Sequence, residues 1–250
     1  MTASAGVPAG GLAGVPAGGA LAAVPAAGNR RSLPMPANLK FFYGPMDCGK
    51  STLALQIDHN HARQGRCGLV LTQGDRSAAP RITTRVGMSR TAVQLNEGTD
   101  LRQVLRNEWA AGRRVDYLIV DEAQFLTAEQ VEQLVGLVDG SHVDVYAFGL
   151  ATDFRSRLFP GSQRLFELAD TITALQVEVL CWCGRSGAFN GRVTDGALVT
   201  EGEQVLIADT AADIQGGRQA ETRYQVLCRR HYRDRDLGPA PGDPDQLALT

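Results

Sequence analysis

Short apolar runs alternate with segments of helical spacing between residues 38 and 176. The apolar runs predict strands at 39–43, 67–72, 116–122, 143–150 and 171–176. Helical spacing lies between them, at 51–64, 100–112 and 127–138. Strands that are apolar throughout and alternate with helices are typical of a parallel sheet that is buried on both faces. The sequence therefore predicts an α/β domain that binds its ligands at the carboxyl ends of the strands.

The pattern changes near residue 177. From there to residue 235 the strands are short, glycines are scattered, and cysteines gather with a histidine, which predicts a second, smaller module. The first segment repeats GVPAGG twice and carries almost no charge, which favours a disordered Ala/Gly/Pro-rich tail. The expected boundaries are a tail at 1–37, an α/β domain at 38–176, a small module at 177–235 and a flexible end at 236–250.

Composition excludes several classes of protein. The 250 residues are 44% hydrophobic and carry a formal net charge of -2, which argues against a broad nucleic-acid-binding surface. Pro and Gly interrupt every apolar run near the N-terminus, and no later run is long enough for a membrane helix. The five cysteines are too few for a disulfide framework in a chain of this length. We therefore expect a cytoplasmic protein with neither nucleic acid nor membrane as its partner.

The stretch GPMDCGKST at 44–52 predicts a phosphate-binding loop. It matches the pattern GxxxxGK followed by Ser or Thr, and it lies between an apolar run and a helical segment, as this motif requires. Glycines let backbone N–H groups turn inward around a phosphate, and the helix adds the positive end of its dipole. Lys50 would neutralise the outer phosphates and Ser51 would bind Mg²⁺. A chance match is improbable, because Lys40 and Lys50 are the only lysines in the sequence.

Two carboxylates, Asp121 and Glu122, end the apolar run at 116–122. In nucleotide-binding proteins an Asp in this place commonly holds Mg²⁺, and a neighbouring acid can orient the attacking group. We assign Asp121 to the metal shell and Glu122 to an acceptor hydroxyl, whose proton it removes late in phosphoryl transfer. Acidic residues also end strands merely because the chain reaches the surface, but the nearby phosphate loop favours the functional interpretation.

Four side chains of metal-binding type occur in two pairs, CWCG and CRRH: Cys181, Cys183, Cys228 and His231. Three thiolates and one imidazole would complete a tetrahedral Zn²⁺ shell without a place for water, so the site would be structural. A redox pair and unlinked buried cysteines are the alternatives, and the CxC spacing is one residue tighter than the common CxxC. We favour zinc. Cys48 and Cys67 have no partners in the sequence and are expected to be small buried side chains.

These segments, in this order, closely resemble the type II thymidine kinases, the family of the cytosolic thymidine kinase of animals and its bacterial relatives. The resemblance runs from about residue 38 to 232. It rests on GPMDCGKST, DEAQF, TDFRSRLFPGS at 152–162, CWCG, EGEQVLI at 201–207 and YQVLCRRHY at 224–232. The CxC with CxxH arrangement is a variant found among bacterial members of the family.

The resemblance implies a P-loop NTPase-type parallel sheet flanked by helices, with a small zinc-ribbon or lasso domain. It implies transfer of the ATP γ-phosphate to the 5′-hydroxyl of thymidine, and usually of deoxyuridine, with Glu122 as the base. ATP and Mg²⁺ would be bound by Gly44, Pro45, Met46, Asp47, Cys48, Gly49, Lys50, Ser51, Thr52, Asp121, Glu122, Ala123 and Gln124. The nucleoside would contact Met46, Arg76, Phe125, Leu150, Phe154 and Tyr224.

The resemblance further implies a homotetramer and a lasso, from about 207 to 224. The lasso would close over the base, read it largely through main-chain groups and be anchored by the zinc ion. Two departures stand out. At position 47 the family usually has an aromatic or small residue, whereas Asp47 places an extra negative charge beside the phosphates. ATP affinity is therefore the property that this departure would affect. The lasso stretch is also longer than usual by several residues.

Two other functions remain open at this point. One is a kinase for another nucleoside, because a base read by main-chain groups leaves little trace in the side chains. The other is a P-loop ATPase whose zinc module binds nucleic acid or protein. The net charge of -2 and the absence of a stripe of aromatic and basic residues count against the second.

Overall fold

The computed structural model describes Met1 and residues 36–73, 80–84, 87–202 and 222–239. No helix within these residues has both the length and the apolar character needed to cross a bilayer. Most of the predicted N-terminal tail and the end of the chain lie outside the described residues. The predicted boundaries of the two domains stay a prediction.

Six parallel strands form the main sheet, in the order β5-β2-β6-β7-β1-β8. Their bounds are β1 Leu39–Tyr43, β2 Gly68–Gln73, β5 Val93–Leu95, β6 Tyr117–Asp121, β7 Asp144–Gly149 and β8 Thr171–Ala174. Five of these are the strands predicted from apolar runs, so the α/β class is confirmed. The short β5 was not predicted, because three residues carry no measurable alternation.

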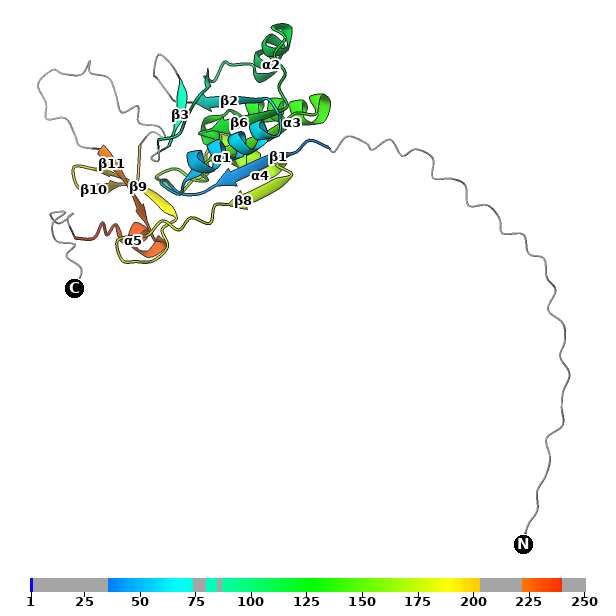
Figure 1. Ribbon diagram of the computed structural model, residues 1–250. Helices are drawn as coiled ribbons and strands as arrows, with labels where there is room; N and C mark the ends of the chain where they lie inside the picture. The colour runs from blue at the N-terminus through cyan, green and yellow to red at the C-terminus, as the bar shows by residue number, and fades with distance from the viewer. Residues whose placement is uncertain (2–35, 74–79, 85–86, 203–221, 240–250) are drawn as a thin grey trace, which may run out of the picture. The chain divides into compact units, whose positions relative to one another are not determined.

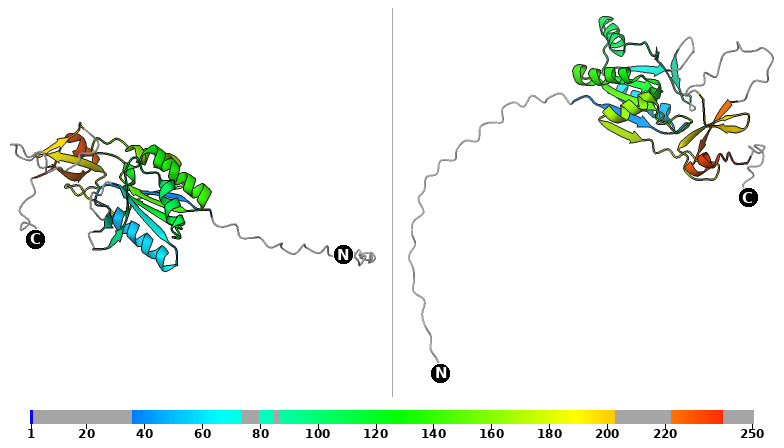
Figure 2. Two further views of the ribbon diagram at one scale, coloured as in Figure 1. Left: turned by 90° about the horizontal axis from the view of Figure 1, so that it is seen from above. Right: turned by 180° about the vertical axis from the view of Figure 1, so that it is seen from behind.

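Side-chain alternation along the central strands divides the core between the two faces of this sheet. Leu118 and Val120 of β6 pack in one cluster, whereas Tyr117 and Ile119 pack in the other. Figure 2 shows α1 (blue) and α3 (green) on opposite faces. The helices are α1 Lys50–Arg63, α2 Leu101–Ala110, α3 Ala128–Ser141 and α4 Pro160–Leu168. A parallel sheet covered on both faces explains why its inner strands are apolar throughout.

The prediction that all five strands are buried on both faces was wrong for β8. This strand ends the strand order, and among the strands that the structure describes it pairs with β1 alone. Ile172 in its middle is 43% exposed. An apolar run alone does not distinguish an edge strand from a central one, because the number of neighbouring strands depends on topology.

Two helix starts show how local sequence sets the boundaries. Thr127 caps α3 in the predicted capping box, with its hydroxyl accepting from the Gln130 amide and the Gln130 side chain accepting from the Thr127 amide. Helix α4 was not predicted, since its start PGS resembles a turn. Pro160 fits the first helical turn, where its missing N–H costs no hydrogen bond. A Cβ on Gly161 would lie 2.5 Å from the Leu126 carbonyl oxygen, so close packing requires glycine there.

The remaining elements lie near the carboxyl ends of the main strands (Figure 1). A two-stranded hairpin joins β3 Arg81–Thr83 and β4 Ser89–Thr91. The C-terminal lobe, defined here as residues 180–202 and 222–239, contains a three-stranded antiparallel sheet in the order β10-β9-β11. Its elements are β9 Phe189–Thr194, β10 Ala197–Val199, β11 Thr222–Leu227 and the short helix α5 Arg229–Asp234.

Candidate active site

The loop between β1 and α1 turns through two left-handed residues. Gly49 precedes α1 with φ 80°, and Asp47 has φ 64°. Glycine adopts this conformation freely, and Asp is one of the few other residues that adopts it at modest cost. The unusual Asp47 therefore suits its backbone position, and its side chain is exposed. Gly44 is required by packing, because a Cβ there would lie 2.5 Å from the Cys48 sulfur.

Lys50 and Ser51 begin α1 and face the end of β6. The Lys50 ammonium group donates to the Pro45 carbonyl oxygen at 2.8 Å, so it lies within the loop that it would share with a phosphate. Ser51 Oγ donates to Asp121 Oδ2 at 2.9 Å. A hydroxyl and a carboxylate held together at a phosphate loop are the oxygen ligands that Mg²⁺ prefers in such sites.

Glu122 directly follows β6 in the left-handed conformation, with φ 54°. Its carboxylate accepts a hydrogen bond from Gln124 Nε2 at 2.5 Å. The other end of the same amide, Gln124 Oε1, accepts from the Leu150 backbone N–H at 3.0 Å. Gln124 is only 1% exposed, so it fixes the Glu122 side chain against the end of β7. Unusual backbone conformations that the surroundings hold in place are common at functional sites.

Burial, together with the charge of Glu122, raises the pKa of Asp121 to about 6. Hydrogen bonds from Ser51 and from the Glu122 backbone N–H, and the charge of Lys50, act in the opposite direction. Two adjacent carboxylates with one of them buried form an electrostatically strained pair, which a cation would relieve.

Two cavities meet at these residues. The smaller, of about 360 Å³, is lined by Met46, Asp47, Gly49, Lys50, Ser51, Thr52, Thr83, Thr84, Glu122 and Leu150. The larger, of about 470 Å³, has a size typical of small-molecule sites. Glu122 lines both cavities, as do Ser51 and Met46. A group bound in one cavity would therefore meet a group bound in the other beside the Glu122 carboxylate.

The larger cavity brings together most of the side chains predicted to hold a nucleoside. Its lining includes Met46, Phe125, Leu150, Phe154 and Tyr224. Arg76 and most of the predicted lasso lie outside the described residues. Among the predicted nucleotide ligands, Cys48, Ala123 and Gln124 are buried and line neither of these two cavities.

Several residues that line the larger cavity were not predicted. They include Thr72 and Gln73 at the end of β2, Arg81, Ile82 and Thr83 on the β3–β4 hairpin, Thr152, Asp153 and Phe159 near the start of α4, and Asn190 on β9. The signal for Phe159 was present in the segment TDFRSRLFPGS. No local pattern marks Asn190 or the hairpin, because both reach the cavity through tertiary contacts.

Three contacts tie the aromatic wall of the larger cavity to the C-terminal lobe. The Arg192 guanidinium lies 3.6 Å from the centre of the Phe154 ring. The Tyr232 hydroxyl donates to the Phe154 carbonyl oxygen at 2.6 Å. Arg155 donates to the Gly202 carbonyl oxygen at 3.1 Å. Phe154 is 2% exposed, so the lobe holds both its ring and its backbone.

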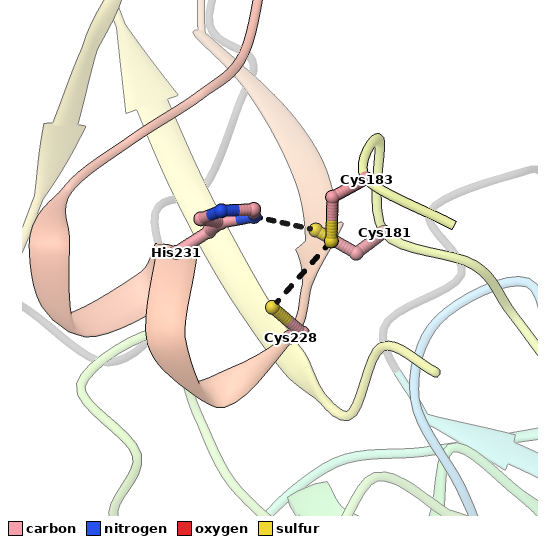
Figure 3. A group of neighbouring side chains, drawn as sticks. All are labelled: Cys181, Cys183, Cys228 and His231. Atoms are coloured by element: carbon pink, nitrogen blue, oxygen red, sulfur yellow. Dashed lines mark hydrogen bonds between the residues drawn. The ribbon is translucent and has the colours of Figure 1, made fainter. Parts of the chain in front are cut away.

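The four predicted metal ligands converge in the lobe (Figure 3). One ligand atom from each of Cys181, Cys183, Cys228 and His231 lies within 4.8 Å of the others. Cys181 Sγ is 3.4 Å from His231 Nδ1, and Cys183 Sγ is 3.9 Å from Cys228 Sγ. Thiolates around tetrahedral zinc lie about 3.8 Å apart for Zn–S bonds of about 2.3 Å. The ligand set and its spacing therefore fit Zn²⁺.

Local backbone structure brings the two members of each pair, Cys181 with Cys183 and Cys228 with His231, close together. Cys181 and Cys183 lie in a tight turn in which the Gly184 N–H donates to the Cys181 carbonyl oxygen at 2.8 Å. Cys228 caps α5 and His231 lies three residues further on, so both side chains point from the same side of the helix.

The groups around the cluster also suit a metal site. The Trp182 ring stacks on the His231 ring with centroids 4.3 Å apart. His231 Nε2, the nitrogen that faces away from the thiols, lies 4.0 Å from Asp236 Oδ2. This distance is too long for a hydrogen bond, but the carboxylate lies on the side of the ring where metal-binding imidazoles commonly have one. Cys67 lies elsewhere and is exposed, so the expectation that it is buried was wrong.

Comparison with known proteins agrees with this arrangement. The family model described as thymidine kinase matches residues 37–232. The chain is 51% identical to a thymidine kinase of Streptomyces coelicolor over 216 residues, which cover 85% of this chain and 98% of that protein. It is 50% identical to a thymidine kinase of Cutibacterium acnes over 79% of this chain and 88% of that protein. A thymidine kinase of Salmonella typhimurium is 38% identical over 79% of this chain and 91% of that protein.

Proposed function

The chain belongs to the thymidine kinase family, and from this premise we propose that it transfers the γ-phosphoryl group of ATP to the 5′-hydroxyl of thymidine, and of deoxyuridine. The product from thymidine, dTMP, would enter DNA synthesis by salvage. The observation that carries the proposal is that Glu122 lines both the cavity at the phosphate loop and the cavity with the aromatic wall. A phosphate donor and a nucleoside acceptor bound there would meet at this carboxylate.

On the donor side, the loop residues Gly44–Ser51 would surround the triphosphate, with Lys50 beside the outer phosphates. Ser51 and Asp121, whose side chains are 2.9 Å apart, would hold Mg²⁺. This ion neutralises phosphate charge as the phosphoryl group moves. The raised pKa of Asp121 supports the assignment, since a cation favours the ionised form that burial disfavours.

On the acceptor side, Glu122 would orient the 5′-hydroxyl and accept its proton. Phosphoryl transfer passes through a loose transition state, so aiming the hydroxyl matters more than ionising it early. Gln124 would act as a positioning residue, because its amide joins the Glu122 carboxylate to the Leu150 backbone. The nucleoside would lie against the larger cavity's apolar wall, beside Phe125, Phe154 and Tyr224.

The four residues of the Cys/His cluster would hold a structural Zn²⁺ ion. With three thiolates and one imidazole the coordination shell is complete, so the ion would fix the lobe and leave the chemistry to the α/β part. Because Arg192 and Tyr232 of the lobe contact Phe154, a lobe fixed by the ion would also hold the wall of the nucleoside pocket in place. The domain division at residue 176 and a cytoplasmic location remain expectations from the sequence, and the homotetramer remains an implication of the family resemblance.

The test is a coupled ADP-release assay with Mg-ATP and a panel of nucleosides. We expect turnover with thymidine and deoxyuridine, and little with cytidine, adenosine or guanosine nucleosides. Lys50→Ala should impair turnover severely. Absence of turnover across the whole panel, from folded and zinc-loaded protein, would contradict the proposal and favour an ATPase. Salt-dependent binding of DNA without nucleoside-stimulated ADP release would identify the ATPase alternative.

A further inference from the structure

One hydrogen bond joins the C-terminal lobe directly to the phosphate loop. The Met46 backbone N–H donates to Asn190 Oδ1 at 2.8 Å. Asn190 lies on β9, the central strand of the lobe's sheet, and is 4% exposed. The two residues are far apart in the sequence, so the bond forms only when lobe and loop have both folded.

This bond fixes which end of the Asn190 amide faces the cavity. A backbone N–H can only donate, so the atom that it contacts must be the carboxamide oxygen, and Nδ2 must point the other way. Within the described residues Nδ2 has no hydrogen-bond partner, and it is not among the sealed side-chain atoms that lack one. Because Asn190 lines the larger cavity, its two N–H groups are available to a molecule bound there.

Asn190 belongs to the part of the site where a base would lie. Glu122 lines both cavities, but Asn190 lines only the larger one, together with Phe125, Phe154 and Tyr224. A nucleoside whose 5′-hydroxyl reaches Glu122 must place its base at the opposite end, against these flat apolar side chains. This step rests on the proposed function, since it takes a nucleoside to be the acceptor.

We propose that Asn190 is a specificity-determining residue whose Nδ2 donates to the 4-keto oxygen of a pyrimidine base and so rejects 4-amino pyrimidines. Thymine and uracil present a carbonyl oxygen at this position, whereas cytosine presents an amino group. Asn190 is buried, so two donors facing each other there would both lose their hydrogen bonds, which is a strong basis for discrimination. The bond to Met46 keeps the amide from turning over to accept from cytosine.

The test compares thymidine with deoxycytidine in the wild type, Asn190→Asp and Asn190→Leu. Aspartate keeps an oxygen for the Met46 N–H but turns the donor into an acceptor. We expect the ratio of kcat/KM for thymidine to that for deoxycytidine to fall about 100-fold in Asn190→Asp. The KM for ATP should change less than about threefold, because the bond to the loop is kept. Leucine removes both bonds, so Asn190→Leu should also raise the KM for ATP.

The matched control is Asn60→Asp, at an exposed position on α1, which introduces the same charge and should leave the ratio unchanged. A ratio in Asn190→Asp within about threefold of the wild-type ratio would overturn the inference while leaving thymidine turnover, and so the proposed function, intact. An equal fall in Asn60→Asp would also overturn it, by assigning the effect to charge alone. If the wild type turns over no nucleoside, the proposed function fails and this inference fails with it.

Discussion

The phosphate side and the nucleoside side of the site are held in place by different means. The phosphate loop, Asp121 and Glu122 follow two central strands of the main sheet, whose faces are packed in extended apolar clusters. Among its described residues the C-terminal lobe has a buried apolar cluster of five, and two of them, Cys181 and Cys228, belong to the Cys/His cluster. So small an apolar core rarely stabilises a fold by itself. We therefore expect a metal ion at the Cys/His cluster to take the place of a larger core and so to support the nucleoside pocket.

Substitution of a proposed metal ligand should give the largest difference between the two sides, with thymidine turnover lost far more than ATP binding. In Cys228→Ser we expect loss of bound zinc and a fall of about 10³-fold or more in kcat/KM for thymidine, because Phe154 loses its support from the lobe. Binding of a fluorescent ATP analogue should weaken only about fivefold, since the loop is built on the main sheet and loses only the hydrogen bond from Met46 to Asn190, worth about 1 kcal/mol. The measurements are zinc content, steady-state kinetics and nucleotide titration.

The matched control for this variant is Cys67→Ser, which alters an exposed cysteine outside the cluster and should change none of these quantities. A zinc content of one per chain in Cys228→Ser would show that the ligand set is wrong. Equal loss of thymidine turnover and ATP binding would instead show that the two sides fold as one cooperative unit. It would contradict the view that they are stabilised by different means.

Substitution of Glu122, on the phosphate side, should lower catalysis while leaving the C-terminal lobe and thymidine binding intact. Glu122→Gln keeps the shape of the side chain but removes the base, so kcat should fall about 10²-fold or more, with zinc content and thymidine binding retained. Steady-state kinetics beside calorimetric thymidine binding would measure this. Glu129→Gln, at an exposed position in the first turn of α3, is the control and should leave kcat unchanged. Near-normal turnover in Glu122→Gln would contradict the assigned role.

The contacts between the two sides can be weakened one bond at a time. Tyr232→Phe keeps the ring, which stacks on Phe189, but removes the hydrogen bond to the Phe154 carbonyl oxygen. Loss of one such bond costs about 1 kcal/mol, so the KM for thymidine should rise about fivefold to tenfold, with the KM for ATP unchanged. Tyr43→Phe is the control, because the Tyr43 hydroxyl has no hydrogen bond within the described residues. A parallel rise in both KM values would contradict a role confined to the nucleoside pocket.

Prediction from sequence found the main strands on the phosphate side, because this side is built on long apolar runs. The residues proposed to bind the nucleotide and Mg²⁺ lie in short motifs, so local patterns are enough to propose Lys50, Ser51, Asp121 and Glu122, whose roles stay a prediction. The same runs did not show that β8 lies at an edge, since strand order depends on topology. Strands β3, β4 and β5 have three residues each, too few for periodicity to be recognised.

On the nucleoside side, only residues that belong to a motif were predictable. The four proposed metal ligands were found from cysteine and histidine spacing. Tyr224 was implied by the family resemblance, and its distance to Cys228 placed it. Asn190 and Arg192 have no such signal, because their roles depend on contacts with Met46 and Phe154 in a distant part of the chain. A polar residue on a short strand is usually solvated, so the sequence gives no reason to place either one in a pocket.

The smallest predicted effect is a change in the stability of the α/β domain with pH, caused by His61. His61 Nδ1 accepts from Arg66 at 3.1 Å, and Nε2 contacts the Tyr146 hydroxyl at 2.9 Å, so the neutral ring satisfies both neighbours. Burial, and then the charge of Arg66, lower the pKa of His61 below its ordinary value. The folded state therefore disfavours the protonated ring, and stability should be lost as pH falls below about 6.5, the unfolded pKa.

His61→Gln retains a donor and an acceptor but does not titrate. Between pH 7.5 and 5.5 the Tm of the wild type should therefore fall about 2–4 °C further than that of His61→Gln, in zinc-loaded protein. Differential scanning calorimetry measures this, with His59→Gln, exposed on the same helix, as the control that should follow the wild type. Equal falls in wild type and His61→Gln would assign the acid sensitivity to other groups and would contradict this role of His61.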